Sequence, residues 1–210
     1  MSIDLARLAG LDVPDSRVTT SLGRDVLLTR RFDRPGGSLR VMVVSGLTML
    51  GLDETESRYG AYPQLLHVLS QFGKCPGEAG AALFQRIAFN IAISNTDALR
   101  NHAAFWDGQH LDLTPAYDLS PMNRSGEAAT QAIAYGRDRQ RDSNFGALFQ
   151  VCHEYGLAVP VARQIIDNII DTIHDGWVDA ADAARLPTVD RDFLGGRQFL
   201  NPGSLYGYIN

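Results

Sequence analysis

Apolar residues at helical spacing dominate the chain from residue 63 onward. Residues 81–94 are apolar nearly all round, which is typical of a helix at the centre of a core. Ahead of them, apolar side chains recur at helical spacing from Pro63 and stop at Gly73, a common helix end. The same spacing predicts three further helices, over 145–155, 159–173 and 179–185.

The first part of the chain has shorter patterns. A helix is predicted over 3–11, and two strand-like runs joined around Gly23 predict a hairpin after it. A second hairpin is predicted within 102–113, because Asp107-Gly108 joins two apolar runs. A small β element followed by a mostly helical body is an α+β fold in which helix dominates.

Three stretches carry no periodic pattern. Residues 74–80 include Pro and Gly and predict a break between two helices. Residues 123–130 are small and polar and predict a mobile loop. The glycine-rich tail from Gly195 is expected to be poorly ordered.

Composition and charge narrow the classes of protein. A hydrophobic content of 45% with 20% charged residues is that of a globular chain, and 210 residues suit one domain or two subdomains. A net charge of −5 gives no overall basic field for nucleic acid or an anionic membrane. Cys75 and Cys152 lack metal-ligand spacing, and no signal peptide or membrane span can be recognised. We therefore expect a cytoplasmic protein with free thiols and no direct nucleic-acid binding.

One polar constellation follows the central apolar segment. Asp97 and Asn101 lie in the turn after it, and Asp118 lies shortly after the second predicted hairpin. Two antiparallel strands would bring Asp118 back beside that turn. Two carboxylates and an amide in this arrangement can hold magnesium and orient a hydroxyl, as phosphoryl transfer requires. Taken alone, each residue is more often part of a helix cap or a turn.

Longer segments carry a resemblance to a known family. The sequence NTDALRNHAAFWDGQHLDLTPAYDLSP resembles the catalytic and metal-binding segments of HipA-like serine/threonine kinases, the toxin kinases of bacterial toxin–antitoxin pairs. LLTRRFDR resembles the strand and hinge between that family's two lobes, and LARLAGLDVPDSRV, SGLTMLGLDE, YPQLLHVL and FGALFQVCHEYGL fit in the same order. The resemblance implies a kinase-like large lobe over 35–210, preceded over 1–34 by a remnant of the small lobe and hinge.

The resemblance also implies roles for single residues. Asp97 would match the catalytic-loop aspartate that orients or deprotonates the substrate hydroxyl. Asn101 and Asp118 would match the two magnesium ligands that hold the ATP phosphates.

On the hinge side, Arg30 and Phe32 would offer backbone groups to the adenine of ATP, with Asp33 near the ribose. Tyr117 would lie against the nucleotide. Phe32 and Tyr117 are equally interpretable as ordinary core aromatics.

Two departures from the family pattern bear on activity. Asn101 follows Asp97 by four residues, whereas kinase catalytic loops use five, and the histidine usual between them is absent. An error of about 1 Å in such a loop can cost on the order of a hundredfold in rate. In addition, the only lysine, Lys74, lies in the predicted break and cannot match the family's strand lysine. The phosphate-gripping loop of the small lobe is also not recognised.

The resemblance thus implies the C-terminal lobe of a HipA-like kinase that uses ATP and Mg²⁺ to phosphorylate a protein hydroxyl, incomplete or inactive alone. Its partners would be a small-lobe polypeptide or a HipB-like antitoxin. The main alternative is a non-catalytic, pseudokinase-type module that binds an antitoxin-like protein. A weaker one is a metal-dependent phosphohydrolase using Asp97, His102 and Asp118, and the chain could be a piece of a longer protein. Arg86 is expected to be a buried structural partner rather than a catalytic clamp.

Overall fold

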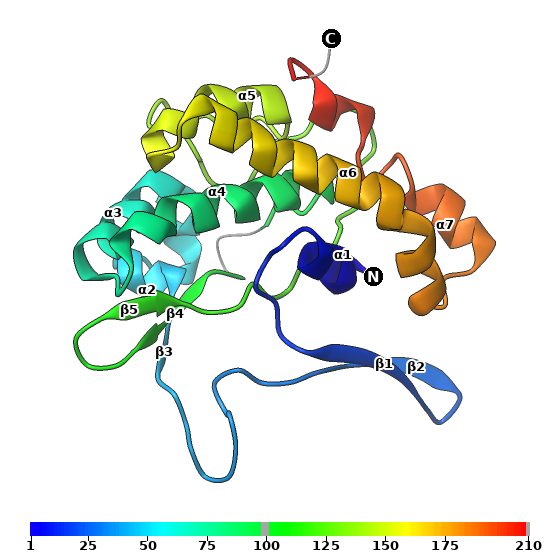
Figure 1. Cartoon of the computed structure of the whole chain (residues 1–210), viewed down its shortest axis with the longest axis horizontal. Coiled ribbons are helices and arrows are strands. Elements are labelled where there is room, and N and C mark those ends of the chain that lie inside the picture. The colour runs from blue at the N-terminus through cyan, green and yellow to red at the C-terminus, as the bar shows by residue number, and fades with distance from the viewer. Residues whose placement is uncertain (98–100, 209–210) are drawn as a thin grey trace.

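The helices form one body, and two small sheets lie along one side of it (Figure 1). The structure, a computed structural model, describes residues 1–97 and 101–208. In chain order its elements are α1 (Ser2–Leu8), β1 (Ser16–Ser21), β2 (Arg24–Thr29), β3 (Val43–Ser45), α2 (Gly46–Leu50), η1 (Glu54–Tyr59), α3 (Tyr62–Phe72), α4 (Pro76–Ala92), β4 (Ala103–Trp106), β5 (Leu111–Leu113), α5 (Phe145–Gln150), η3 (Cys152–Tyr155), α6 (Val159–Ala183), α7 (Thr188–Leu194) and η4 (Pro202–Leu205). Helices dominate over strands, which confirms the α+β class.

Helix α4 is the centre of the core. It packs against α3 and α6, and Leu83, Phe84 and Ile87 are almost wholly buried. The helix begins at Pro76, so the predicted break over 74–80 is wrong beyond its first two residues. Proline suits the first turn of a helix because its missing N–H is not needed there. Gly80 lies where this early part meets η3, and a Cβ there would be 2.0 Å from the Tyr155 carbonyl oxygen.

The two predicted hairpins are both present. Strands β1 and β2 pair in antiparallel register, with Leu22 and Gly23 at φ values of 50° and 73° in the turn between them. Strand β2 is exposed along its whole length, and the hairpin projects from the body (Figure 1). The second hairpin, β4–β5, forms with β3 an antiparallel sheet in the order β3-β4-β5. Its turn is fixed by Asp107, whose carboxylate accepts the backbone N–H groups of Gln109 and His110.

Two predictions about the later helices are wrong. Residues 159–173 and 179–185 do not form two helices, because α6 is continuous from Val159 to Ala183. Gly176, which weakens the helical pattern, lies where α1 crosses α6, and a Cβ there would be 3.2 Å from the Leu5 side chain. The helix predicted over 145–155 is instead divided into α5 and the 3₁₀ turn η3.

The tail is part of the fold, so the expectation of poor order is wrong over residues 195–208. Phe199, Asn201 and Ser204 are buried, and η4 forms within this stretch. The Leu200 N–H donates to the carbonyl of Ala92 at the end of α4. An apolar signal this sparse does not reveal a segment that docks through a few apolar side chains together with hydrogen bonds.

Substituting Gly203 by alanine is expected to lower the free energy of unfolding by about 1–3 kcal/mol, the usual cost of overpacking. The added Cβ would be 1.8 Å from the Glu127 carbonyl oxygen, which joins the tail to the loop after Asp118. Urea unfolding followed by circular dichroism measures the change. Gly126→Ala is the control, because a Cβ at Gly126 meets no atom within 4 Å. Equal midpoints for the two variants would contradict the expectation.

Helix α1 packs onto α6, and Leu5 and Ala6 are buried in the main core. The division of the chain at residues 34 and 35 remains a prediction. Among residues 1–97 and 101–208, none of the helices combines the length and the apolar character that crossing a membrane requires.

Candidate active site

Buried asparagines hold the turn that follows α4. Ser94 has a φ of 54°, and the Asn95 N–H donates to the Asn90 carbonyl at 2.8 Å. The Nδ2 group of Asn95 donates to Asn90 Oδ1 at 3.1 Å and to the Asp118 carbonyl at 3.2 Å. The turn after α4 is thereby tied to the backbone of the segment that follows β5.

Asp118 lies where the second hairpin returns to this turn. Its φ of 55° is left-handed, a conformation that costs about 1–3 kcal/mol for most residues with a Cβ and that clusters at functional sites. The side chain is exposed, and Oδ1 accepts a hydrogen bond from Ser120 Oγ at 3.2 Å. The hairpin therefore brings this carboxylate to the end of α4.

Asp97 and Asn101 lie at the two ends of the same turn. Asp97 is exposed, and Asn101 Nδ2 lies 3.5 Å from the Asp97 carbonyl oxygen. Residues 98–100, where the loop is shorter than in kinases, lie outside the described residues. Asn101 lines the same small cavity as Asn95, whose amide bonds the Asp118 carbonyl.

His102 does not belong to this group of exposed polar side chains. It is buried, with its ring edge-on to the ring of Tyr62 at a centroid distance of 5.1 Å. Within the described part of the chain, no three or more His, Cys, Asp or Glu side chains are grouped closely enough to hold a metal ion. A phosphohydrolase centre built on Asp97, His102 and Asp118 is therefore not supported.

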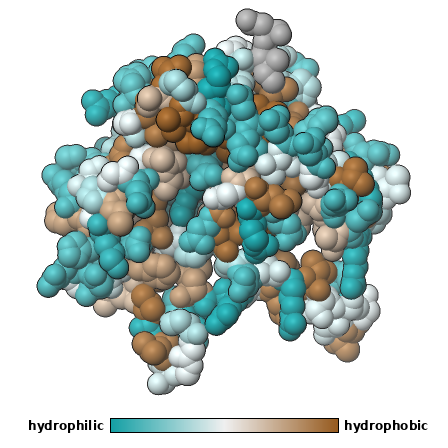
Figure 2. All heavy atoms as spheres, in the orientation of Figure 1, coloured by the Kyte–Doolittle hydropathy of each residue, from teal (hydrophilic) through white to brown (hydrophobic). Residues whose placement is uncertain are grey.

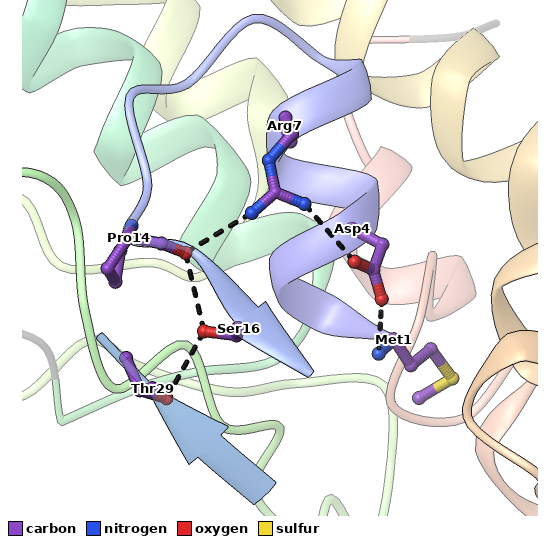
Figure 3. Close-up of polar contacts among 6 residues, drawn as sticks. All are labelled: Met1, Asp4, Arg7, Pro14, Ser16 and Thr29. Carbon is purple, nitrogen blue, oxygen red and sulfur yellow. Dashed lines mark hydrogen bonds and ion pairs between the residues drawn. The ribbon is translucent and has the colours of Figure 1, made fainter. Parts of the chain in front are cut away.

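A cavity of about 690 Å³ opens beside Asp118. It lies between α1, the hairpin β1–β2, the segment 117–121 and the end of α6. Figure 3 shows the polar contacts along one wall. Arg7 donates to Asp4 and to the Pro14 carbonyl, and the Ser16 hydroxyl bonds both that carbonyl and the Thr29 hydroxyl. These bonds fix α1 relative to the hairpin, so the cavity is a built feature of the fold.

The predicted hinge aromatics meet. The ring of Phe32 lies 5.6 Å from that of Tyr117 and 5.8 Å from that of Phe105, measured between centroids. Tyr117 also lines the cavity, and partial burial raises the pKa of its phenol. The predicted hinge segment is thus packed against the segment that carries Asp118.

Arg30 and Asp33, the two charged residues predicted to act at the hinge, bond other residues of the chain. Arg31 donates two hydrogen bonds to the Asp33 carboxylate, at 2.8 and 2.5 Å, and these bonds lower the pKa of Asp33. Arg30 is exposed, with Nη2 3.4 Å from the Pro35 carbonyl and Nη1 3.8 Å from the Asp15 carboxylate. Neither side chain is among those that line the cavity beside Asp118.

Comparison with known proteins identifies the family. A family model described as "HipA-like C-terminal domain" matches residues 1–177. The chain belongs to this family. The resemblance noted in the sequence is thereby confirmed.

Relatives of this HipA-like domain include kinases. The putative kinase Y4mE of Sinorhizobium fredii is 25% identical over 182 residues, which cover 80% of this chain and 43% of that protein. A chain in the complex of HipA, HipB and operator DNA from the Shewanella oneidensis MR-1 toxin–antitoxin system matches with 20% identity and a TM-score of 0.72. That match covers 92% of this chain and 50% of the other, so the chain spans about half the length of these two relatives.

A second solved structure, the Helicobacter pylori proinflammatory kinase CtkA, matches with 11% identity and a TM-score of 0.53. The match covers 87% of this chain and 77% of that one. Together the two structures show the fold, which is that of a kinase-like large lobe of the HipA type.

The HipA-like site fits magnesium better than it fits a complete triphosphate. Carboxylate and amide oxygens are the donors that Mg²⁺ prefers, and Asp118 and Asn101 offer both. The cavity volume lies in the range of small-molecule sites, about 300–1,000 Å³. However, Arg17 is the one Lys or Arg among the described residues that line the cavity. The charges that would neutralise ATP phosphates are therefore sparse among the described residues of this cavity.

Three residues that the sequence did not single out for the site prove to support it. Asn90 and Asn95 bond the turn, and Arg86, one helical turn before Asn90, donates to the Thr114 carbonyl at 2.5 Å. Polar residues inside the apolar segment 81–94 are a signal that could have identified two of them. Arg86 and Asn95, however, bond the main-chain carbonyls of Thr114 and Asp118 after β5, which no sequence pattern marks.

Proposed function

We propose that this chain is the large lobe of a HipA-like serine/threonine kinase, which with a small lobe transfers a phosphoryl group from Mg-ATP to a protein hydroxyl. One observation carries the proposal. The hairpin β4–β5 returns Asp118 to the turn of Asp97 and Asn101, where Asn95 bonds the Asp118 carbonyl at 3.2 Å. Phosphoryl transfer depends on positioning and electrostatics, and this arrangement supports both.

The side chains have distinct roles in this proposal. Asp97, exposed at the surface, orients the substrate hydroxyl and accepts its proton. Asn101 and Asp118 hold magnesium, which when bound neutralises charge on the phosphates. Ser120 Oγ donates to Oδ1 of Asp118, and the other carboxylate oxygen would ligate the metal.

The hinge would hold the base of the nucleotide. Backbone groups of Arg30 and Phe32 would face the adenine. The Asp33 carboxylate, which accepts two hydrogen bonds from Arg31, would also accept one from the ribose. Tyr117 lies against the nucleotide, supported by its contact with Phe32.

The hairpin offers a surface that a small lobe would cover. Within the described residues β1 and β2 pair only with each other, and an isolated two-stranded hairpin is marginally stable in water. Leu22, Leu27 and Leu28 are exposed on it, and Figure 2 shows apolar surface on this projecting part of the molecule. Further strands, from a separate small-lobe polypeptide or from the rest of a longer protein, would cover this surface and supply the phosphate clamp.

Calorimetry with Mg-ATP tests the proposal. We expect little heat from the isolated chain, because Arg17 is the one Lys or Arg among the described residues that line the cavity. We expect micromolar binding when the N-terminal half of the putative kinase Y4mE is fused ahead of residue 1. Micromolar binding by the isolated chain would contradict its incompleteness. No binding by the fusion, with its fold verified by circular dichroism, would contradict the kinase proposal.

A second function is favoured by a different observation. Asn101 follows Asp97 by four residues, so the loop that sets metal geometry is one residue short of the kinase spacing. A non-catalytic module that binds a HipB-like antitoxin would tolerate this change. The matched Shewanella structure contains both HipA and HipB, which is compatible with such a partner.

A further inference from the structure

Helix α4 carries two buried polar residues on one face. Arg86 and Asn90 are four residues apart, which places them one above the other on the helix, and both are buried within the core. Arg86 is 7% exposed, and none of the described residues forms an ion pair with it. A buried charge without a close counter-charge is costly, so its presence in an otherwise apolar helix calls for a compensating role.

The hydrogen bond of Arg86 reaches toward the site. Its Nη2 donates to the Thr114 carbonyl at 2.5 Å, where the chain leaves β5. Burial lowers the pKa of Arg86 to about 10, while Asp12, Tyr62 and Tyr117 oppose that shift. The guanidinium therefore stays charged at neutral pH beneath the segment that carries Asp118.

The second terminal nitrogen of Arg86, Nη1, belongs to a side chain that lines a small cavity. Nη1 is buried and has no hydrogen-bond partner among the described residues. The cavity, about 10 Å³, is lined by Arg86 together with Asn90, Asn95, Asn101 and Tyr117. About one water-sized probe fits a space of this size, and polar partners surround it.

Asn90 completes the arrangement. It accepts the side-chain N–H of Asn95, whose second N–H donates to the Asp118 carbonyl. One face of α4 thus holds both ends of the segment 114–118, directly through Arg86 and indirectly through Asn90. The same face borders the small cavity that Asn101 lines.

We propose that Arg86 and Asn90 are positioning residues that set the place of Asp118 relative to Asn101, and that Arg86 Nη1 binds one internal water shared with Asn101. This inference rests on the proposed function in one respect, that Asp118 and Asn101 ligate a metal. Removing a residue that hydrogen-bonds a metal ligand and orients it typically lowers metal affinity by about 10- to 100-fold.

A neighbouring residue provides a matched control. Gln85 precedes Arg86 on α4, and its side chain also donates to a main-chain carbonyl, that of Ala9 at 2.9 Å. This bond ties α4 to the chain after α1, away from the turn. Gln85→Met and Arg86→Met therefore each remove one side-chain bond to a main-chain carbonyl from α4, and only the bond of Arg86 reaches the site.

The experiment measures Mn²⁺ binding to the full chain by the loss of the free-ion electron paramagnetic resonance signal. We expect Arg86→Met and Asn95→Ala to weaken binding at least about tenfold, and Gln85→Met by less than about twofold. Arg86→Lys, which keeps the charge and one donor, should lose less than Arg86→Met. Equal affinities for Arg86→Met and Gln85→Met, with matching circular dichroism, would overturn the inference. If Arg86→Met does not fold, Arg86→Lys and Asn95→Ala decide in its place.

A second readout separates this inference from the proposed function. Hydrogen exchange of residues 114–118, followed by mass spectrometry, reports how firmly Arg86 holds this segment (the anchor) without any metal. Faster exchange there in Arg86→Met than in Gln85→Met supports the anchor, and equal exchange overturns it. If the wild-type chain binds no Mn²⁺ by itself or in the fusion with a small lobe, the proposed function fails, and the exchange measurement still decides the anchor.

Discussion

Replacing Asp118 by asparagine is expected to weaken Mg²⁺-dependent nucleotide binding at least about a hundredfold. Even the loss of a residue that only orients a metal ligand lowers metal affinity by about 10- to 100-fold. The substitution removes the negative charge that would hold the metal. Asparagine also tolerates positive φ better than most residues, so the backbone at a φ of 55° is retained. The measurement is calorimetry with Mg-ATP on the chain joined to a small lobe.

Asp112→Asn is the control for this prediction. Asp112 is exposed on β5, in the same hairpin and six residues before Asp118. The Asp112→Asn variant should bind nucleotide as the wild type does. Unchanged binding by Asp118→Asn would show that the carboxylate is not a metal ligand and would leave the interaction module as the better proposal.

Local signals in the sequence are sufficient for most elements near the site. The turn residues Gly23 and Gly108 mark both hairpins, and the apolar segment 81–94 marks the central helix. These features depend on neighbours in sequence, which is why they can be read from it. The hairpin after α4 in turn explains why the sequence alone predicts Asp118 beside Asp97.

Features that depend on distant contacts could not be predicted in the same way. Helix α6 runs through Gly176 because α1 crosses there, and no local pattern shows that α1 would be its neighbour. The tail is ordered in part because Asn201 donates to the Gly126 and Arg197 carbonyls, bonds that carry no apolar signature. Phe199 in addition packs against Trp177, a contact that no local pattern shows. In both cases tertiary packing overrides local propensity.

The site shows the same distinction. Asp97, Asn101 and Asp118 could be proposed as site residues because their residue types suit a known chemistry, and their roles remain predictions. Asn95 could not, since its amide bonds a backbone carbonyl 23 residues away. The roles of Arg30 and Asp33 remain predictions, and the contact of Phe32 with Tyr117 is compatible with both a hinge and an ordinary aromatic core.

The two proposed functions differ in what they require of the turn. A kinase needs Asp97 at the substrate hydroxyl and Asn101 at the metal simultaneously. An interaction module needs only that the turn, the hairpin and the cavity wall keep their shape. The Asn95 bond to Asp118 serves both, so a test must change chemistry without changing that bond.

Replacing Asp97 by alanine meets this requirement. Its side chain is exposed, so its loss should leave the fold intact. If the chain is a kinase lobe, we expect Mg-ATP affinity to change by less than about twofold, because Asp97 acts on the hydroxyl. Phosphoryl transfer should fall by about 10²- to 10⁴-fold, the usual contribution of a positioned base. Transfer of ³²P to a protein substrate or to the chain itself, in the presence of a small lobe, measures the rate.

Asp171→Ala serves as the control, because Asp171 is an exposed aspartate on α6 that lies outside the cavity beside Asp118. Its transfer rate should equal that of the wild type. The same two variants expressed in cells distinguish the functions further. A cellular phenotype that Asp97→Ala leaves intact would contradict the kinase proposal and favour the non-catalytic module, because binding to a HipB-like protein does not require a base at the turn.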